Sequence, residues 1–327
     1  MLLGLPLAAY AGHAYVSNED GRTVSVIDTD TAQVVDTIEV GKRPRGIKIS
    51  PDGRRLYVAV SGLPKCPPSM PDAQCAHMKR DLTADGIAVV DVQAHKVVQV
   101  LPAGSDPEQF DIDRSGRRLY VANEDSGTLS VVDIARGEVL TRIAVGREPE
   151  GVRISPDGER VGVTSETDST ITFVSTHLLE AKSKLSVGHR PRDLAYSRDG
   201  RIAYAPGEVD SSVYRLHVPD GTVEQIVQLR PQDRPMGVLL DASRARLYVS
   251  TGRGGSIAVI ALEPRPHQQA EVEVGARPWG MALTPNSLFL YTANGSSNDV
   301  SVVNAVTLKV VRKIPVGRSP WGVVIGP

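Results

Sequence analysis

Aromatic residues are scarce in this sequence, and it has no excess of charge of either sign. Only 4% of the residues are Phe, Trp or Tyr, and 37 basic side chains stand against 38 acidic ones. Because proteins that bind polyphosphate backbones carry an excess of Lys and Arg, the balanced charge argues against nucleic acid as a partner. No stretch approaches the roughly 20 consecutive apolar residues of a membrane-spanning helix, so we expect no membrane span.

Cysteine is also scarce. Cys66 and Cys75 are separated by eight residues in one loop. In an exported protein this spacing predicts a local disulfide, whereas in a reducing compartment both would be free thiols. Residues 1–11 form a short apolar segment ending in Ala9-Tyr10-Ala11, similar to the end of a secretory signal but without its basic start. We therefore predict that residues 1–12 are a signal-peptide remnant or a frayed N-terminus, and that the protein is periplasmic or secreted.

The sequence is rich in glycine and proline, and these residues mark a repeat. A segment of the type Gly-x-x-Pro recurs seven times with variations. Its prolines are Pro44, Pro107, Pro149, Pro191, Pro235, Pro278 and Pro320, with gaps of 63, 42, 42, 44, 43 and 42 residues. A fixed period in this range indicates one supersecondary unit stacked many times.

One repeat contains four short strands. In the unit that follows Pro107, strand-like residues occupy 110–112, 119–122, 129–133 and 139–145, and turn residues separate them. No helical period occurs anywhere. The sequence therefore predicts an all-β, seven-bladed β-propeller with four antiparallel strands per blade.

The two ends of the chain are complementary. Residues 14–16 are a second strand without a first, and residues 322–325 are a first strand without a second. We expect the C-terminal strand to pair into the N-terminal blade, which removes open sheet edges. The predicted domain spans residues 13–327, with an insert loop at 62–85 that explains the long gap of 63 residues.

The repeat motifs resemble those of the YVTN-type propellers over residues 14–327. The resemblance rests on YVSNEDG at Tyr15, YVANEDSG at Tyr120 and YTANGSSND at Tyr291, each followed by a strand of the type (V/L)-S-V-(I/V)-(D/N). The seven units and the insert are similar to exported members associated with pyrroloquinoline-quinone-dependent alcohol oxidation. This resemblance implies a non-catalytic accessory or binding protein that presents a ligand- or partner-binding face at the channel mouth.

The residue after each proline is expected near the mouth of the central channel. In blade order these residues are Trp321, Arg45, Glu108, Glu150, Arg192, Met236 and Trp279. We predict that they form a ligand-binding ring, with a flat apolar surface on one side and carboxylates with guanidinium groups on the other. The alternative is that each arginine pairs with a glutamate of the adjacent blade and the tryptophans cap the core. The arginines before the prolines, Arg43, Arg190, Arg234 and Arg277, are expected to tie neighbouring blades together.

Glutamates recur at one position of the loop after the second strand. Among them, Glu124, Glu166 and Glu208 lie on consecutive blades. Several oxygen ligands on one face suit a hard cation such as calcium, so these three residues are metal candidates. The same acidic sector would equally suit a basic protein partner.

An enzyme remains a further alternative, of the lactonase or lyase type. None of the seven histidines has metal-binding spacing, and no G-x-S-x-G motif occurs. His189 is the candidate general base. A haem or quinone would stack on Trp279 and Trp321, with His77 or His189 as the axial ligand, but the sequence identifies no cofactor. We expect a monomer whose partner is a small ligand or a periplasmic protein.

Overall fold

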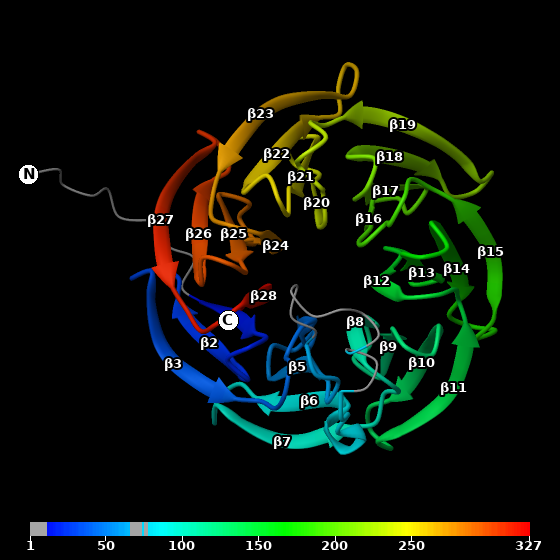
Figure 1. Cartoon of the computed structure of the whole chain (residues 1–327), viewed down its shortest axis with the longest axis vertical. Coiled ribbons are helices and arrows are strands. Elements are labelled where there is room, and N and C mark those ends of the chain that lie inside the picture. The colour runs from blue at the N-terminus through cyan, green and yellow to red at the C-terminus, as the bar shows by residue number, and fades with distance from the viewer. Residues whose placement is uncertain (1–11, 66–73, 75–77) are drawn as a thin grey trace, which may run out of the picture.

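Seven four-stranded antiparallel sheets surround a central axis like the blades of a propeller (Figure 1). This computed structural model describes residues 12–65, 74 and 78–327. The prediction of a seven-bladed all-β propeller is confirmed. In the described part of the chain no helix is long and apolar enough to cross a membrane.

Each blade has its four strands in order from the channel to the rim. From the inner to the outer strand they are β28 (Pro320–Gly326), β1 (His13–Asn18), β2 (Thr23–Asp28) and β3 (Gln33–Glu39) in blade 1; β4 (Ile47–Ile49), β5 (Arg55–Val60), β6 (Gly86–Asp91) and β7 (Lys96–Leu101) in blade 2; β8 (Pro107–Ile112), β9 (Arg118–Asn123), β10 (Thr128–Asp133) and β11 (Glu138–Ala144) in blade 3; β12 (Pro149–Ile154), β13 (Arg160–Ser165), β14 (Thr170–Ser175) and β15 (Ala181–Ser186) in blade 4; β16 (Ala195–Tyr196), β17 (Ile202–Gly207), β18 (Ser212–His217) and β19 (Thr222–Gln228) in blade 5; β20 (Val238–Asp241), β21 (Arg246–Ser250), β22 (Ser256–Ala261) and β23 (His267–Glu273) in blade 6; and β24 (Pro278–Leu283), β25 (Phe289–Asn294), β26 (Asp299–Asn304) and β27 (Lys309–Pro315) in blade 7.

The middle strands of each blade are buried on both faces because each sheet packs between two neighbouring sheets. In β9 and β10 the central four residues are buried, and Tyr120 pairs with Val131 across the two strands. The outer strand β11 is largely exposed. This arrangement explains why the sequence shows continuous apolar runs in the middle strands and polar residues in the outer ones.

The ends of the chain close the ring. Strand β28 pairs antiparallel with β1, with Ala14 opposite Ile325 and Val16 opposite Val323, and Figure 1 shows the red C-terminal strand beside the blue N-terminal blade. The predicted closure by the C-terminal strand is confirmed. It leaves blade 1 with the same four strands as the others, so no inner edge is left incomplete.

In four of the seven blades the inner strand starts earlier than expected; in the unit after Pro107, for example, the first strand was predicted at residues 110–112. In blades 1, 3, 4 and 7 the strand begins at the proline itself. Proline lacks an amide hydrogen and is tolerated as the first residue of such a strand. All seven residues before the prolines have positive φ angles, namely Arg43, Asp106, Glu148, Arg190, Arg234, Arg277 and Ser319. This conformation turns the chain from one outer strand into the next inner strand.

Glycine follows most of the prolines after one residue, because the inner strands of neighbouring blades approach closely there. A Cβ atom on Gly280 would lie 2.7 Å from the carbonyl oxygen of Trp321. We expect Gly280→Ala to lower the free energy of unfolding in urea by about 1–3 kcal/mol, since the backbone must move apart. At Gly158 a Cβ meets no atom within 4 Å, but φ is +79°, so Gly158→Ala measures backbone strain alone. A loss at Gly280 within the roughly 0.5 kcal/mol of an ordinary surface substitution would contradict the close approach.

Candidate functional site

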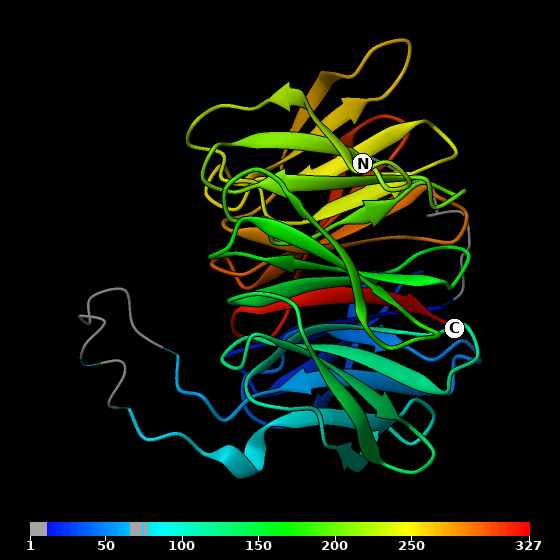
Figure 2. The ribbon, with the colours of Figure 1, turned by 90° about the vertical axis from the view of Figure 1, so that its right-hand side faces the viewer.

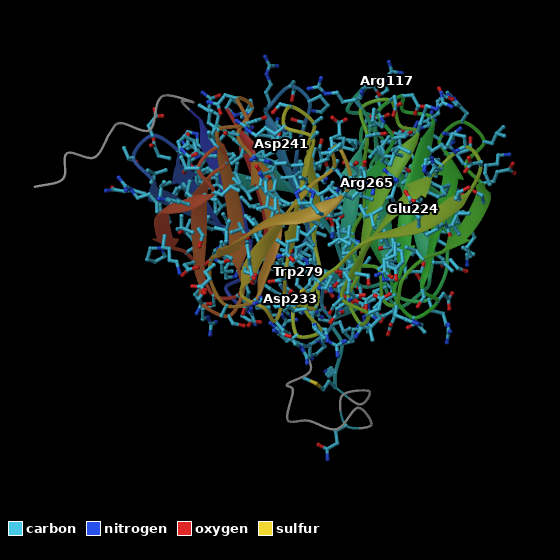
Figure 3. All side chains as sticks on the ribbon, turned by 90° about the horizontal axis from the view of Figure 1, so that it is seen from above. Arg117, Glu224, Asp233, Asp241, Arg265 and Trp279 are labelled. Atoms are coloured by element: carbon cyan, nitrogen blue, oxygen red, sulfur yellow. The ribbon has the colours of Figure 1, made fainter. Side chains whose placement is uncertain are left out.

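The two faces of the disc differ, and one of them carries the variable loops. The 3-10 helix η1 (Leu82–Ala84) belongs to the insert, and in the edge-on view this cyan segment extends beyond the blades on one side (Figure 2). Trp279 and Asp233 lie toward the face from which the insert emerges, whereas Arg117 and Asp241 lie toward the opposite face (Figure 3). We call the first of these the loop face.

A cavity of about 770 Å³ opens at the channel mouth on the loop face. Its charged and aromatic lining residues are Glu19, Asp20, Arg43, Lys65, Glu108, Arg192, Arg277, Arg318, Trp279 and Trp321. A second cavity of about 490 Å³ lies farther along the channel, and Trp279 and Trp321 line it as well. The two indole rings therefore lie between the cavities and form the floor of the one at the mouth.

The aromatic floor is a packed unit. The ring centroids of Trp279 and Trp321 are 5.1 Å apart with an interplanar angle of 35°, and both rings cluster with the buried Met236. The guanidinium carbon of Arg192 lies 5.2 Å from the centroid of the Trp279 ring, and that of Arg277 lies 5.7 Å from it. These cation–π contacts hold two positive charges beside a flat apolar surface.

Arg45 is at the centre of the first charged cluster, between blades 2 and 3. Its side chain is 1% exposed. It donates to Asp106 at 2.5 Å, to the carbonyl oxygen of Pro107 at 2.9 Å and to Oε1 of Glu108, and Glu124 lies 3.4 Å away. One guanidinium therefore faces three carboxyl groups, which fix its position and are fixed by it.

Arg192 is at the centre of the second charged cluster, between blades 4 and 5. It donates to Glu150 at 2.7 Å and to Glu208 at 2.6 Å, and forms an ion pair with Glu166 at 2.6 Å. These contacts use Nη1 and Nε. In the described part of the chain Nη2 has no hydrogen-bond partner, so it remains available to a ligand in the cavity.

Burial and the closeness of other carboxyl groups shift the pKa values of the carboxyl groups in both clusters. Burial raises the pKa of Glu108; Asp106 and Glu166 add to the rise, and Arg45 opposes it. Burial also raises the pKa of Glu150 well above its ordinary value, while Arg192 acts in the opposite direction. Glu150 is thus the protonated partner of Glu166, whose pKa is lowered by the hydrogen bond from Glu150 and by Arg192 although burial opposes this. The two clusters therefore contain carboxyl groups whose pKa values are shifted in opposite directions, which is common at functional sites.

The protonation of Glu124 gives a testable pH dependence. Burial and repulsion from Glu108 raise its pKa to about 9, against 4.5 for an ordinary glutamate. The stabilisation from this bound proton is fully present below pH 4.5 and is lost as the pH rises through 9. We therefore expect the free energy of unfolding to fall between about pH 6 and pH 9, and to fall less in Glu124→Gln, as measured by denaturant titration. The same slope in Glu124→Gln, with exposed Glu148→Gln as the reference, would contradict the assignment.

The structure brings the seven predicted ring residues together. Some of them line a cavity, as the ligand-binding prediction requires, and others form pairs between blades, as the alternative requires. Glu108, Arg192, Trp279 and Trp321 line the mouth cavity. Arg45 and Glu150 are buried behind it: Arg45 pairs with Glu108 of the adjacent blade, and Glu150 accepts a hydrogen bond from Arg192 of the adjacent blade. Met236 supports the tryptophans and lines a neighbouring cavity.

Asp106, the buried partner of Arg45, was not predicted from the sequence. It occupies the position before the proline that holds arginine in four other blades. The feature of the sequence that could have revealed it is an acidic residue at the position before the proline, where other blades have arginine. The expectation that all four arginines of this column tie blades together is also wrong in part: Arg43 pairs with Glu19 and Arg190 with Glu166, but Arg234 and Arg277 form no such pair among the described residues.

The predicted metal ligands and the predicted general base have other surroundings than expected. Among the described residues no group of three or more His, Cys, Asp or Glu side chains is arranged to hold a metal ion. Glu166 and Glu208 bond Arg192, and Glu124 faces Arg45 instead. His189 is exposed and does not line the mouth cavity. Cys66, Cys75 and His77 lie outside the described residues, so the disulfide and the role of His77 remain predictions.

A propeller with a lined cavity at the mouth of its channel is thus the class that fold and site define. The family model described as "Lactonase, 7-bladed beta-propeller" matches residues 8–143 and 152–308. The chain belongs to this family of lactonase propellers.

Individual relatives are distant. The antigen Lp49 of Leptospira interrogans is 28% identical over 109 residues, which cover 33% of this chain and 22% of that protein. Among solved structures, the periplasmic gluconolactonase of Pseudomonas aeruginosa has a TM-score of 0.75 at 19% identity, with 97% of this chain and 99% of that chain covered. A chain of Kuenenia stuttgartiensis hydrazine synthase has a TM-score of 0.75 at 19% identity, and the match covers 92% of this chain and 97% of that chain. At these identities the likeness shows the fold alone.

The family corrects the functional prediction. From the repeat motifs we expected a non-catalytic accessory protein for alcohol oxidation, but the matched family is that of the lactonase propellers. The lactonase alternative is the one that these findings favour. The tyrosines of the misleading motifs, Tyr15, Tyr120 and Tyr291, are core residues of second strands, so this part of the motifs describes architecture and not chemistry.

Proposed function

We propose that the protein is a lactonase that opens a small lactone ring in the mouth cavity on the loop face. The observation that carries this proposal is the carboxyl group of Glu108. Its side chain lines the cavity, its Oε1 accepts a hydrogen bond from Arg45, and its Oε2 is a buried oxygen with no hydrogen-bond partner among the described residues. A fixed carboxylate with one unbonded oxygen beside an aromatic surface is what a general base needs.

The floor of the cavity provides the substrate platform. A lactone is a small ring with an apolar face and polar edges, and such a ring packs on the indole rings of Trp279 and Trp321. Arg192 lies against Trp279 and has its Nη2 unbonded among the described residues, so it is placed to donate to the carbonyl oxygen of a lactone on this surface. Negative charge develops on that oxygen during attack, and a fixed guanidinium stabilises it.

The reaction then follows from these groups. Glu108 in its ionised form takes a proton from water as the water oxygen bonds to the lactone carbonyl carbon. Arg192 stabilises the resulting oxyanion. When the ring C–O bond breaks, the proton held by Glu108 passes to the ring oxygen. Water and lactone give one hydroxy acid, and both residues return to their starting states.

The test is hydrolysis of a panel of γ- and δ-lactones of sugar acids. The rate is measured from the acid released, with a pH indicator in a weakly buffered solution. We expect initial rates above the spontaneous rate that increase in proportion to protein concentration and saturate with substrate. Heat-denatured protein is the control. No acceleration for any lactone that the cavity of about 770 Å³ accommodates would contradict the proposal.

A further inference from the structure

Equivalent arginines of the repeat have different partners. In blades 2 and 5, the arginine before the proline bonds the glutamate that follows the second strand of the preceding blade. Arg43 Nε donates to Glu19 at 3.1 Å, and Arg190 Nε donates to Glu166 at 2.9 Å. In these blades the arginine is neutralised by an inter-blade ion pair.

In blades 6 and 7 this partner is lost. The glutamate available to Arg234 is Glu208, but Glu208 is bonded by Arg192 at 2.6 Å. The residue available to Arg277 is Gly252, which has no side chain. Within the described residues neither arginine forms a side-chain hydrogen bond or ion pair, and the same is true of Arg253.

These three arginines line one cavity of about 580 Å³ beside the mouth. Five arginines and one glutamate line this cavity: Arg190, Arg192, Arg234, Arg253, Arg277 and Glu208. The cavity shares Arg192 and Arg277 with the mouth cavity. The single carboxylate is already bonded to Arg192, so the cavity has a strong excess of positive charge.

We propose that Arg234, Arg253 and Arg277 form a binding site for a small oxyanion, either a phosphate or a carboxylate group. Guanidinium groups bind both through paired N–H donors, and several such groups around a concave surface favour an anion there. Bringing three positive charges together without a carboxylate partner costs free energy that a bound anion recovers. The site is separate from Glu108 and does not depend on the proposed lactonase activity.

The chain contains a native probe for this site. Its only two tryptophans are Trp279 and Trp321, and Arg277 lies 5.7 Å from the Trp279 ring. An anion bound by Arg277 therefore changes the tryptophan fluorescence. The experiment titrates the protein with inorganic phosphate, with citrate and with sodium chloride at matched ionic strength.

We expect a saturable fluorescence change with phosphate or citrate and none with chloride; the tighter of the two ligands shows whether the site prefers phosphate or carboxylate. In the double variant Arg234→Gln/Arg253→Gln the affinity should fall at least about tenfold, since two charge-assisted hydrogen bonds to the anion are removed. Arg147→Gln is the control, because Arg147 is an exposed arginine of the loops of blade 4 that pairs with Asp168. If the double variant is unstable, the single variant Arg253→Gln, at an exposed position, replaces it. A response equal to that of chloride, or an unchanged affinity in the variants, would overturn the proposal.

Discussion

Replacement of Glu108 with glutamine is expected to lower kcat for lactone opening by about two to four orders of magnitude, the usual contribution of a positioned base. Glutamine has the same shape and still accepts a hydrogen bond from Arg45, so the folded structure should persist. It cannot accept a proton from water. The measurement compares initial rates and thermal melting of the wild type and the variant.

The matched control is Glu148→Gln, which removes an exposed carboxylate from the loops of blade 4. The pH profile adds a second readout. Because Glu108 must be ionised and burial raises its pKa, kcat/KM of the wild type should fall on acidification at a pH above the ordinary value of 4.5. Full activity of Glu108→Gln would show that the base lies elsewhere.

Replacement of Arg45 with methionine is expected to cost about 3–5 kcal/mol of unfolding free energy at neutral pH, because it leaves buried carboxylates without their counter-charge. Asp106 and Glu108 are the residues affected. In the wild type Arg45 holds the pKa of Asp106 below its ordinary value, although burial opposes this. Without the guanidinium, burial dominates and the pKa values of both carboxyl groups rise.

The sign of the pH effect follows from that rise. Groups whose pKa is raised by folding contribute stability below their unfolded pKa, and this contribution is lost as the pH rises through the folded pKa. The deficit of Arg45→Met should therefore be largest above neutral pH and shrink toward about pH 4. Denaturant titrations across this range measure it, with Arg147→Met as the exposed reference. A deficit that is constant with pH would indicate lost packing instead of unpaired charge.

The repeat predicted most of the fold because its signals are local to one unit. The prolines fixed the number of blades, and the unmatched strands at residues 14–16 and 322–325 predicted the closure that β1 and β28 show. The prediction of where the inner strands start was less accurate. The positive φ angle before each proline completes the turn earlier than a loop of average length would.

The site was predicted only in part, because its contacts join different blades. The column after the prolines contained Arg45, Glu108, Glu150 and Arg192, but their pairing depends on how neighbouring inner strands are offset. His189, the candidate general base, is exposed and does not line the mouth cavity. Its place two residues before the proline could not show this, because Arg318 holds the same position before Pro320 and does line the cavity.

The most direct test of the account is a crystal structure of Glu108→Gln soaked with an intact sugar lactone. We expect the ring to lie on the Trp279–Trp321 surface, with its carbonyl carbon beside the side chain of residue 108 and its carbonyl oxygen within hydrogen-bond distance of Arg192. A lactone bound elsewhere, for example in the cavity on the far side of the tryptophans, would contradict the assignment of the reaction to the mouth of the channel.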